Sequence, residues 1–406
     1  MDIPSFIALA VALLLGLGIP KAFSLLYLGL VGAAFWLHRY PGSGASRLLI
    51  WSMGWMVLFG LSYAAFQVGW AVWNPPSSYV AEILAVTVLP AAGLWVGWLL
   101  HRRGQSFCTA LILAYVGGAL VYSLASLALS RTPWWNVTET FVHVVRVPWG
   151  HPEFLSTRAV EQRAFLSLVL LPIGLTLATA QIKRCRYLGA LMLGMAFLAA
   201  HVSWAMRGRI GLAALAISLI PLLWLFGRHS IRWIVLLISG FAMAFAIGSG
   251  YLCDERPWLV GGFLARLLEA PWGGRLIQYS YADCNPQAIN QFGSFPGSSS
   301  FTPHNLVLDV YNDAGWIPAL CLLIAILPIC FSLLVGFWRS ISVSGWTWPL
   351  ALRWSFVSVL VVEWLAQPFL YTDQLMFAVG FVAAGIFLAE FNEKSTRASA
   401  AIPVAY

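Results

Sequence analysis

Charged residues are scarce in this chain. Among its 406 residues, 23 are Lys or Arg and 15 are Asp or Glu, so that 9% of the chain is charged and 60% is hydrophobic. A soluble globular protein is about a quarter charged, because solvated side chains must cover its surface. At this length it would have two or three domains to cover. The deficit excludes a soluble enzyme, a disordered chain and a nucleic-acid-binding domain, and it predicts a multi-spanning membrane protein.

The apolar residues gather in long, unbroken runs. A transmembrane helix needs about 20 apolar residues, whereas the strands of a membrane barrel would give shorter, alternating segments. We therefore expect an all-α polytopic membrane protein that forms one integral-membrane domain over 1–406, with a cytoplasmic tail at 391–406. The first run has no preceding Lys or Arg and no cleavage site, which indicates a retained helix. The twelve predicted spans are 4–19, 22–37, 48–70, 79–100, 107–129, 164–180, 187–205, 210–226, 233–251, 315–337, 349–370 and 374–390.

Basic residues in the short loops predict the orientation. Lys and Arg concentrate in loops on the cytoplasmic side, and here they fall on one side if both termini lie there too. The opposite, periplasmic side then holds two long segments, 130–163 and 252–314. Arg207 and Arg209 break the rule, because they fall at the outer turn between the seventh and eighth spans. Two interpretations stay open: they snorkel to lipid phosphates, or they bind an anion on the outer face.

Cysteine usage points to the same outer face. Cys253 and Cys284 are the two cysteines of the second long segment. If that face is oxidising, they could form a disulfide that closes a loop of about 30 residues. No Cys or His pair has the spacing of metal ligands, and no acidic pair suited to a metal is present, so we expect neither a metal nor another cofactor.

A short capped helix is predicted at the end of the second long segment. Thr302 suits the N-cap, Pro303 the first helical position and Gly315 the C-terminal stop. His304 then lies in the first turn, where the helix dipole disfavours imidazolium and favours a neutral general base. Asn305 and the same N-terminus could hold a phosphate or a sugar hydroxyl. The alternative is a histidine that is simply hydrogen-bonded at a membrane interface.

Five arginines are expected on the same face as His304. Guanidinium groups pair bidentately with phosphate, and a diphosphate leaving group needs such a clamp because charge builds on it as its bond breaks. Glu363 lies inside the eleventh span and could be functional or could support the cleft. The candidate diphosphate-binding residues are Arg207, Arg209, Arg256, Arg266 and Arg275.

These motifs, in this order, resemble the O-antigen ligase family. His304-Asn305, nine residues and Gly315 are similar to its H-[NSQ]-x9-G signature. Met206-Arg207-Gly208 resembles its Ser-Arg-Gly, and Glu269-Ala-Pro-Trp-Gly-Gly resembles its loop segment E-x-P-x-x-G. The similarity covers roughly residues 200–320, and the earlier spans agree only in general hydropathy.

The chain also departs from the family pattern. Met206 replaces the serine, and Pro318 stands where the family has Tyr or Thr. The loop tryptophan is displaced relative to Arg256, so that Arg266 and Arg275 remain alternatives as the functional loop arginine.

The resemblance implies a GT-C-like, metal-independent and inverting glycosyltransferase with His304 as its catalytic residue. Its donor would be a glycan on undecaprenyl diphosphate, its acceptor a sugar hydroxyl of lipid A-core, and its site the periplasmic face of the bacterial inner membrane. The related O-antigen polymerase joins two lipid-linked repeats and stays an alternative. The absence of glycine sixteen residues beyond any of the five arginines, where the R-x15-G motif of polymerases would place it, favours the ligase. A transporter of lipid-linked glycans is the more distant alternative.

Overall fold

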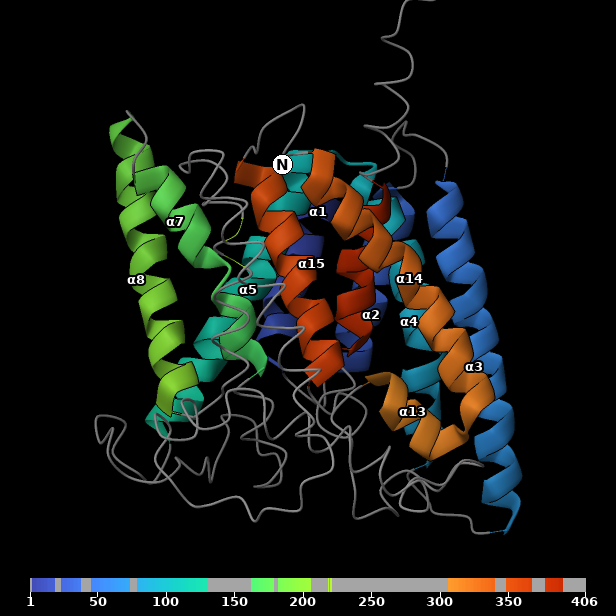
Figure 1. The fold of residues 1–406 in the computed structure, drawn as a ribbon. Helices are drawn as coiled ribbons and strands as arrows, with labels where there is room; N and C mark the ends of the chain where they lie inside the picture. The colour runs from blue at the N-terminus through green and yellow to red at the C-terminus, as the bar shows by residue number, and fades with distance from the viewer. Residues whose placement is uncertain are drawn as a thin grey trace, which may run out of the picture.

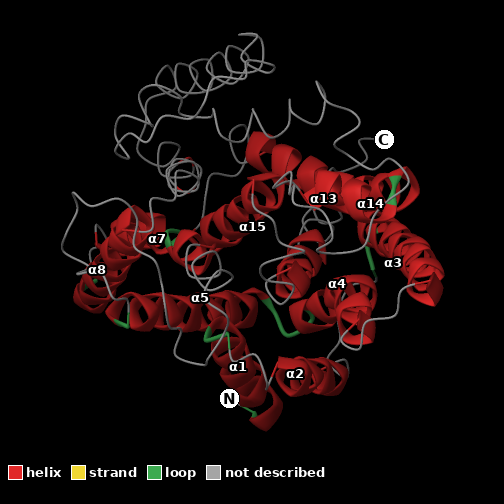
Figure 2. Ribbon diagram, turned by 90° about the horizontal axis from the view of Figure 1, so that it is seen from below, coloured by secondary structure: helices red, strands yellow, loops and turns green. Residues whose placement is uncertain are grey.

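The described residues are helical apart from short turns. The computed structural model describes residues 2–18, 23–37, 45–73, 79–129, 162–178, 182–205, 218, 220, 306–339, 348–366 and 377–389, and this part of the chain contains no strand (Figures 1 and 2). The all-helical class is thereby confirmed. The helices are α1 (Ile3–Gly16), α2 (Phe23–Leu37), α3 (Arg47–Trp73), α4 (Tyr79–His101), α5 (Gln105–Ala128), a short helix at 162–167, α7 (Leu170–Ala178), α8 (Lys183–Ala205), α13 (Leu306–Ala314), α14 (Trp316–Arg339), α15 (Trp348–Ala366) and Phe377–Ala389.

Four helices in the described part are long and apolar enough to cross a membrane. They contain the segments Arg47–Gln67, Gln105–Ala128, Lys183–Ser203 and Trp316–Trp338. Shorter apolar helices lie at other predicted spans, whereas the eighth and ninth spans fall almost entirely outside the described residues. The basic residues at 183–186 begin α8, although the sequence placed them in a loop.

One end of the helix bundle is held by arginines. Arg103 Nη2 lies 3.1 Å from Asp2 Oδ2, which joins the turn after α4 to the start of α1. Arg353 is 1% exposed, and its Nη1 donates hydrogen bonds to Gln105 O at 3.2 Å and Thr109 Oγ1 at 2.8 Å. The starts of α1, α5 and α15 therefore lie at the same end, which is the upper end in Figure 1.

The opposite end contains a buried arginine that the sequence placed at the edge of the first long loop. Arg163 is 3% exposed, its Nε donates to Gly16 O at 3.3 Å, and its guanidinium carbon lies 4.5 Å from the Tyr122 ring centroid. Gly16 ends α1, where the helix dipole favours a cation. Gly18 has φ +62°, and a Cβ there would meet the guanidinium. Arg163 thus holds the end of α1 against α5.

Glycines let α1 and α5 approach closely. A Cβ added at Gly118 would overlap the backbone carbonyl of Leu13, and one added at Gly16 would overlap that of Tyr115. Small residues at a helix crossing permit the backbone packing that drives helix association in membranes. The two glycines place α1 directly on α5, at the edge of the described bundle (Figure 2).

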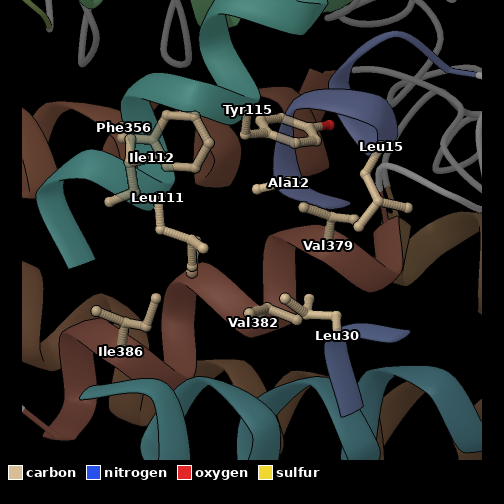
Figure 3. A pocket seen from close by; sticks show the side chains of 11 residues that line it. Ala12, Leu15, Leu30, Leu111, Ile112, Tyr115, Phe356, Val379, Val382 and Ile386 are labelled. Atoms are coloured by element: carbon tan, nitrogen blue, oxygen red, sulfur yellow. The ribbon is translucent and has the colours of Figure 1, made fainter. Parts of the chain in front are cut away.

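A small apolar cavity lies where α1, α2, α5, α15 and the helix Phe377–Ala389 meet (Figure 3). Its volume of about 30 Å³ leaves room for little more than one water molecule, and a stable buried water needs polar partners that this lining does not present. We interpret it as a packing gap. Its lining residues are Ala12, Leu15, Leu30, Leu111, Ile112, Tyr115, Phe356, Val379, Val382, Ala383 and Ile386.

Candidate functional site

Most of the predicted site lies outside the described residues. Of the predicted site, the structure describes Glu363 and the helix that follows His304 in the chain. The two long segments, 130–163 and 252–314, are described only at their last residues, 162–163 and 306–314. The predicted site residues that lie outside the described part are His304, Asn305, Arg207, Arg209, Arg256, Arg266, Arg275, Cys253 and Cys284.

The helix next to the signature histidine is α13. It spans Leu306–Ala314 and ends where the sequence predicts, at Gly315. Gly315 has φ +81°, and its N–H donates to Tyr311 O at 2.9 Å. This is the left-handed C-terminal stop that glycine adopts without steric cost. The stop redirects the chain into α14, which begins at the next residue, Trp316.

One face of α13 is buried. The residues of this face recur at the spacing of an amphipathic helix, and two of them are aspartates. Burial of a carboxylate costs free energy unless polar groups surround it. We therefore expect polar as well as apolar neighbours on this face. The buried residues are Leu306, Asp309, Val310, Asp313 and Ala314.

Glu363 lies on a helix that α13 contacts. It is fully buried in α15, close to the end opposite Arg353, and α15 contacts α13. Asp309, Asp313 and Glu363 are thus three buried carboxylates on two helices that contact each other, toward the end of the bundle that contains α13. Among the described residues, no group of three His, Cys, Asp or Glu side chains could hold a metal ion.

Glu363 was predicted from the sequence as a candidate site residue, whereas Asp309 and Asp313 were not. A readable signal was present, because Asp309 and Asp313 interrupt the apolar positions of a helical stripe at a spacing of four residues. Such interruptions on a buried face indicate a polar environment rather than lipid or an apolar core.

The C-terminal end of α13 is held by a side chain from α3. Gln67 Nε2 donates a hydrogen bond to the backbone carbonyl of Asp313 over 3.1 Å, and both residues are buried. This carbonyl is one of the last four of the helix, which have no partner within it. α3 and α13 are in contact, and they lie beside each other at the lower end of the bundle in Figure 1.

The described bundle is apolar, with buried polar groups at both ends: Arg353 at one end, and Asp309, Asp313 and Glu363 toward the other. The apolar helices suit a lipid environment, and the carboxylates make the end that contains α13 polar. No family model matches this chain, and no curated protein matches it. The functional assignment therefore depends on its residues and their placement.

Proposed function

We propose that this protein is an O-antigen ligase, which transfers a glycan from undecaprenyl diphosphate to a sugar hydroxyl of lipid A-core. The observation that carries the proposal is the His304-Asn305 pair directly before a helix that ends at Gly315. That helix packs at one end of an apolar bundle, with Asp309 and Asp313 buried. The ordered motifs of residues 200–320 support it.

We place twelve helices in the bacterial inner membrane, with both termini in the cytoplasm and a GT-C-like arrangement. The end of the bundle that contains Asp2, Arg103 and Arg353 then faces the cytoplasm, and the end that contains α13 faces the periplasm. Two observations support this placement: the charge pattern of the short loops and the position of α13 at the end opposite Arg103.

In the proposed reaction His304 acts as general base. It accepts the proton of the acceptor hydroxyl as that oxygen bonds to the anomeric carbon, and the bond from this carbon to the diphosphate oxygen breaks on the opposite face. Undecaprenyl diphosphate leaves with the electron pair of that bond, and the anomeric configuration inverts. A positioned base contributes typically about 10²–10⁴-fold to such a step.

The arginines stabilise the leaving diphosphate. Arg207 is the first candidate, because it follows Met206 in the segment that resembles the family's Ser-Arg-Gly. A second guanidinium from Arg256, Arg266 or Arg275 would complete a bidentate clamp. Arginine–phosphate contacts of this kind gain strength as charge develops on the leaving group.

The polymerase and transporter alternatives predict different motifs and different positions for ionisable residues. A polymerase would share the donor, the face and the residues, but the chain lacks the R-x15-G spacing at its outer arginines. A transporter places ionisable residues and broken helices near the bilayer midplane. The aspartates of α13 instead lie on a short helix at one end of the bundle, which favours an interfacial active site.

Deletion of the gene followed by gel analysis of the surface glycan tests the assignment. A ligase null should lose long glycan from lipid A-core and accumulate the polymer on its carrier lipid. A polymerase null should instead retain a single repeat attached to the core. Normal lipopolysaccharide in the null strain would rule out both enzymes.

A further inference from the structure

We propose that Gln67 is a positioning residue for His304, an inference that rests on the proposed function. Its side-chain amide, from α3, holds the C-terminal end of α13, and His304 precedes the other end of that helix by two residues. Gln67 would act on the reaction through the orientation of α13, without touching the substrate.

The hydrogen bond between Gln67 and Asp313 O is well placed for this role. Both residues are buried, so that water cannot replace either partner. The Asp313 carbonyl belongs to the last turn of α13, whose carbonyls need hydrogen-bond donors from outside the helix. In apolar surroundings, an amide that loses such a bond leaves a donor and an acceptor unsatisfied.

The bond also supplies direction, which apolar packing does not. Leu306 and Val310 are buried where α13 packs on the bundle. Apolar contacts are not directional, so they tolerate small rotations and translations of a helix. A hydrogen bond prefers an angle above about 150° and weakens steeply below about 120°. Gln67 therefore fixes where the C-terminal end of α13 lies relative to α3.

A small movement at this end becomes a large one at the other. A helix of nine residues is about 14 Å long, so that a tilt of about 5° displaces its far end by about 1 Å. Misplacement of a catalytic group by 1 Å can cost about 10²-fold in rate. His304, the proposed general base, precedes the start of α13 by two residues in the chain. In the proposed function the diphosphate is held by arginines elsewhere in the chain.

The chain offers a matched control in the same helix. Ser52 of α3 is also fully buried, and its Oγ donates to a backbone carbonyl, that of Ala325 in α14. Ser52→Ala and Gln67→Met both remove a buried hydrogen bond from an α3 side chain to a backbone carbonyl. Of these two bonds, that of Gln67 reaches α13 and that of Ser52 reaches α14. If both residues had a purely structural role, the two changes would have similar effects.

The test is steady-state glycan transfer by the full-length protein in proteoliposomes, with undecaprenyl-diphosphate-linked glycan as donor and lipid A-core as acceptor. For Gln67→Met we expect kcat to fall by about 10–100-fold, with the KM for donor within about threefold of wild type. Ser52→Ala should leave both parameters near wild type. An unchanged kcat in folded Gln67→Met would overturn the proposal, and so would an equal loss in Ser52→Ala.

A second measurement separates this inference from the proposed function. Hydrogen–deuterium exchange of the backbone amides at 306–314 should accelerate in Gln67→Met and stay unchanged in Ser52→Ala. If wild type shows no transfer at all, the proposed function fails and, with it, the role of Gln67 in catalysis, whatever the exchange shows. If wild type transfers glycan and exchange at 306–314 is unaffected by Gln67→Met, the positioning claim fails alone.

A shorter donor keeps the proposal testable if Gln67→Met does not fold. Gln67→Asn retains an amide that falls one methylene short of Asp313 O. We expect an intermediate loss of kcat for this variant, with partial acceleration of exchange at 306–314. A kcat equal to that of wild type would contradict the role of Gln67.

Discussion

Arg103 and Asp2 form an ion pair in which Nη2 and Oδ2 lie 3.1 Å apart. The pair joins the start of α1 to the turn between α4 and α5, so these two segments lie at one end of the bundle. The Gln67–Asp313 bond and Arg163 lie toward the opposite end. Which of the two ends faces the periplasm decides whether the proposed mechanism can operate.

The two ends should therefore differ in their accessibility. In a cysteine-free background, we expect Ser298→Cys to react with a membrane-impermeant maleimide in cells whose outer membrane has been permeabilised. Lys183→Cys, at the exposed start of α8, should react only after the inner membrane is opened as well. Reaction of Ser298→Cys exclusively from the cytoplasmic side would reverse the orientation and remove the mechanism with it.

The α1–α5 crossing makes a prediction about stability. Gly118→Ala should lower the free energy of unfolding by about 1–3 kcal/mol, because the added methyl group collides with the Leu13 carbonyl. Gly117→Ala, one residue earlier, is the control. Its added Cβ would meet only Leu13 Cδ1 at 3.9 Å, so it should be neutral or stabilising by up to about 1 kcal/mol. Thermal unfolding in detergent measures both variants, and equal midpoints would contradict the close approach.

Arg207 should matter for turnover more than an arginine at the other end. Loss of its guanidinium should cost about 10²-fold or more in kcat/KM, because a charged hydrogen-bonding partner of the diphosphate is removed. Arg207→Lys should restore only part of the rate, since an ammonium cannot make the bidentate fork. Arg102→Ala provides the control, because Arg102 lies over the Trp98 ring at the end of the bundle that contains Asp2 and Arg103. Near-normal turnover of folded Arg207→Ala would exclude this arginine from the site.

Local signals predicted the features of the fold that depend on neighbouring residues. The apolar runs predicted helices at α3, α5 and α14, because hydrophobic length is a property of contiguous sequence. The stop at Gly315 was predictable for the same reason, since glycine adopts the left-handed conformation at a helix end without steric cost.

Contacts between segments that are distant in the chain could not be predicted from the sequence. Arg163 was placed at the end of a loop, but its acceptor on Gly16 is 147 residues away in the chain. The role of Gln67 could not be predicted from the sequence, because its acceptor, the Asp313 carbonyl, lies 246 residues further on. Asp309 presents the intermediate case, since the helical period was readable but the burial of that face depends on α14, α15 and α3.

The central claim is that this chain transfers glycan to lipid A-core with His304 as its base. Its most direct test is the single-turnover transfer rate of purified protein in proteoliposomes, compared for wild type, His304→Ala and His304→Gln. We predict transfer by wild type and a loss of about 10²–10⁴-fold in His304→Ala. Donor binding should be retained, because the proposed diphosphate ligands are arginines. His304→Gln should lose a similar factor, because an amide can orient the acceptor but cannot take its proton. Retention of most of the rate by the Gln variant would make His304 an orienting residue, and retention by folded His304→Ala would contradict the account.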